Sequence, residues 1–331
     1  MKSPRKLPGV SPRSWEHPAD RAALGVLERT GGLQEVIRMI VGGTTERSLR
    51  LLHVGGTVKV TATQFPKVKQ MLDQVVDVMD WPTTPDVFVA NNPFFNAGVL
   101  GVKEPFIVLN SGAVGMLDDD ELYCVVAHEM GHIMSGHNVY MTVLWALLQL
   151  SVGALPIAGL LVKPLILALK EWERKSELTA DRAALLALQS EQENYNLLMK
   201  AAGGGDLSQM NVNDFFQQAF EYDSQKTITD GIFKLLNTVG QTHPFAVVRL
   251  QELHTWAVSG EYAAILGGTY ARRGDAAPTT SEEVKAGWEH YKSSVQESDD
   301  PLARAVRNVG DTVGKATEGL RGALKDILKN R

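Results

Sequence analysis

The sequence predicts a mostly α-helical fold of the α+β class, with one small β-sheet or hairpin beside a central helix. Apolar residues recur every three or four positions over most of the chain, which is the period of helices that bury one face. Only two short segments, Asp86–Ala90 and Phe106–Leu109, have the length and the β-branched or aromatic composition of strands. At 331 residues the chain is long enough for one large domain with appendages.

The charge and cysteine content narrow the class of protein. The net charge is −5, and no block of basic residues precedes the C-terminal region, which argues against nucleic acid as the main partner. Cys124 is the only cysteine, so an internal disulfide is impossible, and we expect a reducing, cytoplasmic location. We expect Cys124 to be a small core residue, with approach to a metal as the alternative.

The N-terminal residues 1–21 are polar, basic and interrupted by prolines, without the apolar core of a secretory signal. We expect them to form a disordered arm, followed by one domain over residues 22–260. This domain begins with helices over Ala22–Leu52, interrupted by glycine pairs at 42–43 and 55–56. A further helix is predicted over Phe65–Met79 from apolar residues at helical spacing: Val68, Met71, Leu72, Val75 and Val76.

The segment His128–His132 has the sequence HEMGH, in which two histidines stand four residues apart. Residues four apart lie one turn above each other on the same helical face, so both imidazoles can bind one metal ion. Glu129, beside the first histidine, can then act as general base toward a water molecule at the metal. The alternative is a chance occurrence of the pattern on a surface helix.

The flanks of this segment favour the metal site. Asp118 and the acids after it are typical of a helix N-terminus. His137 falls one position short of the third ligand of a metzincin, so we expect a structural role for it. Apolar residues at helical spacing predict that the helix is buried, where ionisable residues need partners such as a metal: Leu122, Val125, Val126, Met130 and Ile133.

A third ligand is expected from Glu177, which stands one turn before Asp181 on a second predicted helix. Together with His128 and His132, Glu177 would complete a set of two histidines and one glutamate for one Zn2+ per chain. Asp181 would accept a hydrogen bond from the outer N–H of a ligand histidine. The alternative is a solvated charged face, which we expect for the neighbouring residues 173–175.

These motifs resemble those of the HtpX and CAAX prenyl protease family of gluzincin zinc metallopeptidases. The resemblance implies a zincin-type helical core in which His243 stabilises the oxyanion and Arg249 orients the site. It covers roughly residues 87–253 and is carried by several elements: Asn96-Ala97, Ile107 to Gly112, Asp119 to Leu122, His128 to His137, Glu177 to Asp181, Thr242-His243-Pro244 and Arg249.

One departure from the family follows Asn96-Ala97, where relatives have a short Pro-Gly-Gly turn and this chain has a longer hairpin. The second strand of that hairpin corresponds to the edge strand on which relatives dock peptides. An exposed edge offers backbone donors and acceptors to an extended substrate. The resemblance therefore implies a substrate-binding set at this hairpin: Asn96, Ala97, Phe106, Ile107, Val108 and Leu109.

The most apolar part of the chain is residues 139–169, of which residues 139–162 carry no formal charge. That length suggests a transmembrane helix, but two ligands that meet at one metal require an even number of crossings. Two crossings need about 40 apolar residues, and the segment from 139 to 169 has 31. We therefore predict a helical hairpin inserted between the ligand helices. It dips into one membrane leaflet, docks on a partner, or packs on the protein's own helices.

The C-terminal part is predicted to contain a polar linker over residues 261–300 and a basic amphipathic helix over residues 301–331. The last segment carries seven Lys and Arg against three acids, a net charge of +4. Such a helix can lie on an anionic membrane or pack back on the catalytic domain, and both alternatives stay open.

Two functions are compatible with these features. The first is a zinc-dependent endopeptidase acting on polypeptide substrates, which the resemblance associates with protein quality control. The second is a catalytically silent, zinc-stabilised chaperone or scaffold that binds peptides. The presence of Glu129 favours the enzyme, because loss of this base is the simplest way for such a protein to lose its catalytic activity. We expect a cytoplasmic protein with no nucleic-acid partner, and peripheral or monotopic contact with the inner face of the cell membrane.

Overall fold

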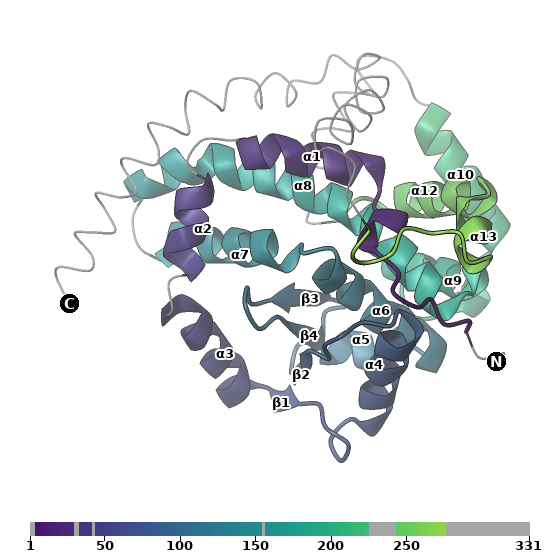
Figure 1. The fold of residues 1–331 in the computed structure, drawn as a ribbon, viewed down its shortest axis with the longest axis horizontal. Coiled ribbons are helices and arrows are strands. Elements are labelled where there is room, and N and C mark those ends of the chain that lie inside the picture. The colour runs from purple at the N-terminus through teal and green to yellow at the C-terminus, as the bar shows by residue number, and fades with distance from the viewer. Residues whose placement is uncertain (1–3, 30–32, 42–43, 154–155, 225–242, 276–331) are drawn as a thin grey trace.

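The computed structural model describes residues 4–29, 33–41, 44–153, 156–224 and 243–275 (Figure 1). Within these residues, helices surround one four-stranded sheet, which confirms the predicted mostly α fold. The predicted C-terminal helix over residues 301–331 lies outside the described residues, as does the larger part of the predicted linker.

Residues 4–21 have a defined, partly buried structure, so the predicted disordered arm is wrong for them. Leu7, Val10 and Trp15 are at most 1% exposed. The segment runs beside residues 271–273, where the backbone N–H of Arg273 donates to the carbonyl of Gly9 at 2.7 Å. Only partners far along the chain bury these few apolar residues, so the local composition gave no sign of order.

The helices of the first third follow the prediction in part. The predicted break at residues 42–43 falls between the second and third helices, whereas Gly55 and Gly56 end the third, and the first helix begins at Pro18 and not at Ala22; a fourth helix matches Phe65–Met79. On this fourth helix, four of the predicted apolar positions are buried and Val76 is partly buried. These elements are η1 (Pro12–Ser14), α1 (Pro18–Arg29), α2 (Leu33–Val41), α3 (Thr44–Gly56) and α4 (Pro66–Val78).

The sheet has the strand order β1-β2-β4-β3, with β2 and β4 parallel and the other two pairs antiparallel. Its strands are β1 (Val58–Lys59), β2 (Asp86–Ala90), β3 (Ala97–Leu100) and β4 (Phe106–Asn110). The prediction that residues 106–109 form an edge strand is wrong, because β4 lies between β2 and β3. Among the described residues, β3 forms the edge of the sheet on this side.

The two faces of the sheet pack on different helices, because successive side chains of a strand point to opposite faces. Val87 and Ile107 join the main core with α4 and α6 (Asp119–Met134). On the other face, Phe88 and Phe106 meet edge to face, with ring centroids 5.5 Å apart, and pack on Leu49 of α3. The sheet is therefore covered on both sides.

The central helix α6 begins with a reciprocal cap, as the acids before it predict. The Asp118 side chain accepts hydrogen bonds from the backbone N–H groups of Asp120 and Glu121, and the Glu121 side chain accepts one from that of Asp118. Such a cap contributes about 1 kcal/mol. Every residue from Glu121 to Met134 is buried, because α6 lies between the sheet and the long helix α8 (Pro156–Leu188) (Figure 1).

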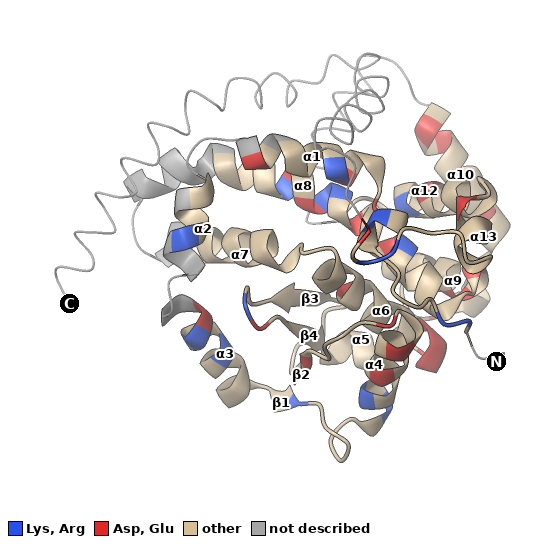
Figure 2. Cartoon of the chain, viewed as in Figure 1, with Lys and Arg blue, Asp and Glu red and all other residues tan. Residues whose placement is uncertain are grey.

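The predicted helical hairpin consists of α7 (Asn138–Gly153) and the first part of α8, which pack on each other. α7 carries no charged residue (Figure 2). Its side chains Val143, Leu144 and Leu147 are at most 2% exposed and form a cluster with α1, α2 and α8. Of the three alternatives for the hairpin (a membrane leaflet, a partner, or the protein's own helices), the structure supports the last for these residues. Among the described residues, no helix has the length and apolar character needed to cross a membrane.

The remaining helices are α5 (Ser111–Met116), which precedes α6, then α9 (Glu191–Gly203), η2 (Leu207–Gln209), α10 (Val212–Ser224), α12 (Ala246–Val258) and α13 (Glu261–Leu266). Of these, α9 and α12 pack on α8, and α10 and α13 pack on α9 and α12 in turn. Tyr262 and Ile265 belong to the main core. The domain therefore extends beyond residue 260, and the predicted polar linker is wrong for residues 261–275.

Candidate metal centre

The three predicted metal ligands converge at the contact between α6 and α8. His128 Nε2 lies 3.1 Å from His132 Nε2 and 3.3 Å from Glu177 Oε2, and His132 Nε2 lies 3.4 Å from Glu177 Oε1. All three side chains are buried. α6 supplies the two histidines at a spacing of one turn, and α8 supplies the glutamate opposite them.

The outer nitrogens of both histidines have partners that fix the position of the ring proton. His128 Nδ1 lies 3.0 Å from the Asp181 carboxylate, and His132 Nδ1 lies 2.9 Å from His137 Nδ1. When both rings are neutral, with the proton on Nδ1 as a metal ligand requires, two bare Nε2 lone pairs face each other, and buried Glu177 Oε2 has no hydrogen-bond partner. A cation between these three atoms relieves the repulsion, so the residues fit a zinc ion.

The pKa values of the three ligand side chains show that the site favours a bound positive charge. Burial lowers the pKa of His132 to about 3, so this imidazole is neutral, as a ligand must be. Burial opposes protonation of His128 too, but the negative charges of Glu177 and Asp181 outweigh it and raise the pKa to about 10. Without a metal, a proton on this ring therefore supplies the positive charge that the site favours, and a bound cation would replace it. Burial also disfavours the Glu177 carboxylate, yet the positive charges of His243 and His128 hold its pKa well below the usual value.

Asp181 and Arg249 form a buried pair behind His128. Arg249 Nε donates to Asp181 Oδ2 at 2.8 Å, and Arg249 Nη2 donates to Oδ1 at 2.5 Å. Burial raises the pKa of Asp181, but the Arg249 charge and its hydrogen bonds outweigh that effect and lower it to about 2. Arg249 Nη1 also lies 3.5 Å from Glu177 Oε2. The two predicted residues thus lie where they can orient one ligand directly and contact another.

Glu129 and His243 lie on the open side of the ligand set. Burial raises the pKa of Glu129 to about 7, the range in which a carboxylate serves as general base near neutral pH. His243 Nε2 lies 3.4 Å from Glu177 Oε2, and its side chain is 41% exposed. His243 precedes α12, which carries Arg249.

Two cavities meet at this site. The larger, about 620 Å³, lies toward α9, α10 and α12, and the smaller, about 290 Å³, lies toward α3 and α7. Four residues line both: Asn96, Ala97, Glu129 and His243. The cavities therefore flank the catalytic side of the ligand set and share the beginning of the edge strand β3.

The predicted substrate-binding residues separate into two groups. Asn96 and Ala97 border both cavities, and Val108 borders the smaller one. Phe106, Ile107 and Leu109 are fully buried in the interior strand β4, so the prediction that they bind a substrate backbone is wrong. A hairpin motif does not reveal which of its strands pairs with β2, because that pairing is between segments distant in the sequence.

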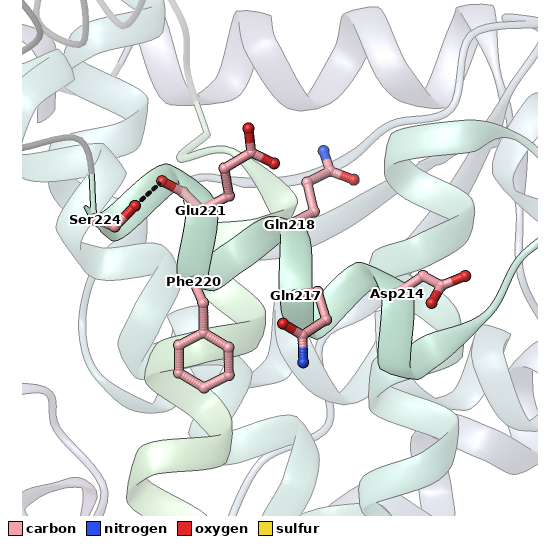
Figure 3. Close-up of a pocket in the computed structure, with 6 residues that line it drawn as sticks. All are labelled: Asp214, Gln217, Gln218, Phe220, Glu221 and Ser224. Carbon is pink, nitrogen blue, oxygen red and sulfur yellow. Dashed lines mark hydrogen bonds between the residues drawn. The ribbon is translucent and has the colours of Figure 1, made fainter.

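A depression on α10 lies outside this site. Figure 3 shows its six lining residues, all of which come from that one helix, and the hydrogen bond from Ser224 Oγ to the carbonyl of Glu221. The two ligand helices contribute nothing to its lining, so it is not the catalytic centre.

Two residues near the ligands were not predicted to act there. His137 was expected to be structural, yet it contacts the ring of the ligand His132. Asp20 lies in the segment expected to be disordered, and its carboxylate is 3.0 Å from His137 Nε2. Asp20 and His137 are 117 residues apart (137 − 20), so no local sequence pattern connects them.

Cys124 is fully buried in the main core, as expected for a small core residue, and burial raises the pKa of its thiol well above the usual value.

The fold and this ligand set define a zinc metallopeptidase of the gluzincin type. The chain belongs to peptidase family M48, whose model matches residues 62–257. It is 33% identical over 258 residues to the plastoglobule-localized metallopeptidase 48, chloroplastic, of Arabidopsis thaliana, a match covering 76% of this chain and 74% of that protein. It is 32% identical over 82 residues to a protease HtpX homolog of Helicobacter pylori, covering 24% of this chain and 26% of that protein.

No solved structure matches the chain. The family assignment confirms the predicted resemblance, the metalloprotease class and zinc as the metal.

Proposed function

We propose that this metalloprotease is a zinc-dependent endopeptidase that uses Glu129 as its general base. The observation that carries the proposal is the position of Glu129, which borders both cavities beside a complete set of ligands. An extended polypeptide that fills both cavities would pass over this carboxylate with chain on either side, as an internal cleavage requires.

The chemistry is divided among few residues. His128, His132 and Glu177 would hold the zinc ion, which when bound would supply Lewis-acid polarisation of the scissile carbonyl and a lower pKa for water. Glu129 removes a proton from the attacking water and delivers it to the leaving amine. His243 donates a hydrogen bond to the oxygen on which negative charge develops. Arg249 holds Asp181, which in turn fixes the His128 ring.

We propose that the edge strand β3 holds the substrate backbone. The carbonyl of Asn96 accepts from the N–H of Asn110, so the peptide groups of Asn96 face β4. Because the direction alternates along an antiparallel strand, those of Ala97 and Val99 face away from β4. These groups can pair with an extended peptide whatever its sequence. The larger cavity has apolar walls suited to a hydrophobic side chain, among them Leu197, Leu198, Phe215 and Val247.

We further propose a cytoplasmic role in protein quality control. A backbone-directed grip suits a protease that acts on many unfolded chains, and the single cysteine fits a reducing compartment. The Arabidopsis relative is named as plastoglobule-localized. That name supports only a peripheral association with a lipid surface, for which we propose the inner face of the cell membrane in this protein.

The test uses Glu129→Gln, which leaves all three ligands intact. The variant should bind as much zinc as the wild type by elemental analysis, yet hydrolyse casein more slowly by several orders of magnitude. Glu221→Gln on the exposed face of α10 is a matched control and should retain full activity. Wild-type activity in Glu129→Gln contradicts the mechanism. Zinc-bound wild-type protein that binds casein without cleaving it points to the scaffold instead.

A further inference from the structure

A chain of buried polar side chains runs from the ligand His132 to the N-terminal segment. His132 Nδ1 lies 2.9 Å from His137 Nδ1, and His137 Nε2 lies 3.0 Å from Asp20 Oδ2. The three residues are 1%, 2% and 2% exposed. They come from α6, from the turn before α7, and from the first turn of α1. The metal ligand is thus connected to a carboxylate from a distant part of the chain.

The direction of each hydrogen bond follows from the metal side. His132 Nε2 faces Glu177 Oε1 and His128 Nε2, so this nitrogen must offer a lone pair to the metal. The ring proton of His132 therefore sits on Nδ1 and is donated to His137 Nδ1. His137 then carries its own proton on Nε2 and donates it to Asp20. Only this arrangement gives each ring nitrogen of His132 and His137 a suitable partner: an acceptor for each N–H, and a donor or the metal for each lone pair.

The Asp20 carboxylate is itself fixed in place. Trp172 Nε1 donates to Oδ1 at 3.0 Å, and the Thr179 hydroxyl donates to Oδ2 at 2.6 Å. The backbone N–H of His17 donates to that same hydroxyl oxygen at 2.9 Å. Both Trp172 and Thr179 belong to α8, the helix that carries Glu177. The carboxylate is thereby held against α8, the helix that supplies the third metal ligand.

We propose that Asp20 and His137 are positioning residues for the ligand His132. The pair sets the tautomer of His132 and the orientation of its ring, and increases its strength as a metal ligand. Asp20 lies outside residues 62–257, the part of the chain that the family model matches. The N-terminal segment of this protein is thus a working part of its metal site. The proposal rests on the metal-binding part of the proposed function, and not on proteolysis.

The proposal explains why the two histidines have different partners. Behind His128, Asp181 accepts directly and is held by Arg249. Behind His132, the carboxylate acts through an intervening imidazole. Each ligand histidine therefore has an acceptor backed by negative charge, which raises the basicity of the nitrogen that faces the metal.

The main experiment measures zinc affinity of the full chain by competition with a chromophoric chelator at constant pH. His137→Leu removes the acceptor, and Asp20→Asn removes the charge; each should weaken zinc binding 10- to 100-fold. His137→Asn places a side-chain oxygen near the position of Nδ1 and should recover most of the affinity. His254→Leu is the matched control, because it removes an imidazole that contacts Tyr195 and Glu191 and no metal ligand, and it should keep wild-type zinc affinity.

A double-mutant cycle separates positioning from general stability. If Asp20 acts on His132 only through His137, Asp20→Asn should change the zinc affinity of the His137→Leu variant less than about twofold. The d–d absorption spectrum of the Co2+-substituted protein should change in His137→Leu and return in His137→Asn. Imidazole 15N shifts of the zinc form should place the His132 proton on Nδ1.

Wild-type zinc affinity in His137→Leu overturns the proposal, and so do equal losses in His137→Asn and His137→Leu. Additive losses in the double variant also overturn it. Should Asp20→Asn fail to fold, the comparison of the two His137 variants still decides. Wild-type protein that binds zinc but cleaves no casein disproves the proposed endopeptidase and leaves this proposal standing.

Discussion

Gly131 lies so close to Ala183 that a Cβ atom on Gly131 would be 2.7 Å from the Cβ of Ala183. The same atom would be 3.3 Å from the Cα of Ala180. Gly131 is the residue before the second ligand histidine on α6, and Ala180 and Ala183 follow Glu177 on α8. This close approach of two helices, possible only with small residues, brings the ligands within reach of one metal ion.

Gly131→Ala should therefore push α8 away from α6. The clash costs about 1–3 kcal/mol, which the better helix propensity of alanine offsets by about 1 kcal/mol. We expect a net loss of stability and a lower zinc affinity, measured by urea unfolding and by chelator competition.

The matched control is Gly115→Ala on α5, where an added Cβ has no neighbour within 4 Å. Only the propensity gain applies there, so this variant should be unchanged or slightly more stable, with normal zinc affinity. Normal zinc binding in Gly131→Ala would show that the helix spacing at this point does not control the site.

Glu177→Ala should lower the zinc content of the purified protein, because two histidines alone bind the metal more weakly than the complete set. Elemental analysis after dialysis against a weak chelator measures the effect, with Glu221→Gln as the control. Full zinc occupancy in Glu177→Ala would mean that another residue is the third ligand. His243, whose Nε2 lies 3.4 Å from Glu177 Oε2, would then be the first candidate for that ligand.

Leu147→Lys should destabilise the protein by at least about 3 kcal/mol, because the charge replaces a side chain that is 1% exposed in the cluster of α7, α8, α1 and α2. Leu167→Lys, at a position 43% exposed, should change stability by less than about 0.5 kcal/mol. Thermal unfolding compares the two. A stable, folded Leu147→Lys that no longer binds liposomes would instead support insertion of the hairpin into a leaflet.

Glu173 should make the metal-free protein less stable at alkaline pH. It was expected to be solvated, but its Oε2 is buried without a hydrogen-bond partner. Burial, with the charge of Glu177, raises its pKa from 4.5 to about 8. The folded state therefore holds more protons than the unfolded state between these values, so this contribution to stability decreases as pH rises from about 4.5 to about 8.

Glu173→Gln removes this titration and keeps the shape of the side chain. Compared with the wild type in urea unfolding at several pH values, it should be relatively more stable at pH 9 than at pH 5. Parallel stability curves for the two proteins would show that the Glu173 carboxyl is hydrated in the folded state.

The sequence alone determined the features that depend on local geometry. The two histidines of HEMGH are one turn apart on any helix, and so are Glu177 and Asp181, so the ligand set followed from spacing. The acids from Asp118 onward predicted the start of α6, and the apolar period predicted α4. The family resemblance supplied His243 and Arg249, which lie beside Glu177.

The tertiary structure decided everything that depends on pairing between distant segments. A strand pattern does not specify its neighbours, and the parallel pairing of β4 with β2 moved the substrate edge from Phe106–Leu109 to β3. The burial of Leu7, Val10 and Trp15 also required partners far along the chain. The polar, proline-containing composition of this segment therefore did not predict that it packs on the domain. The same long-range packing placed Asp20 beside His137, since a hydrogen bond between distant residues leaves no periodic signal in the sequence.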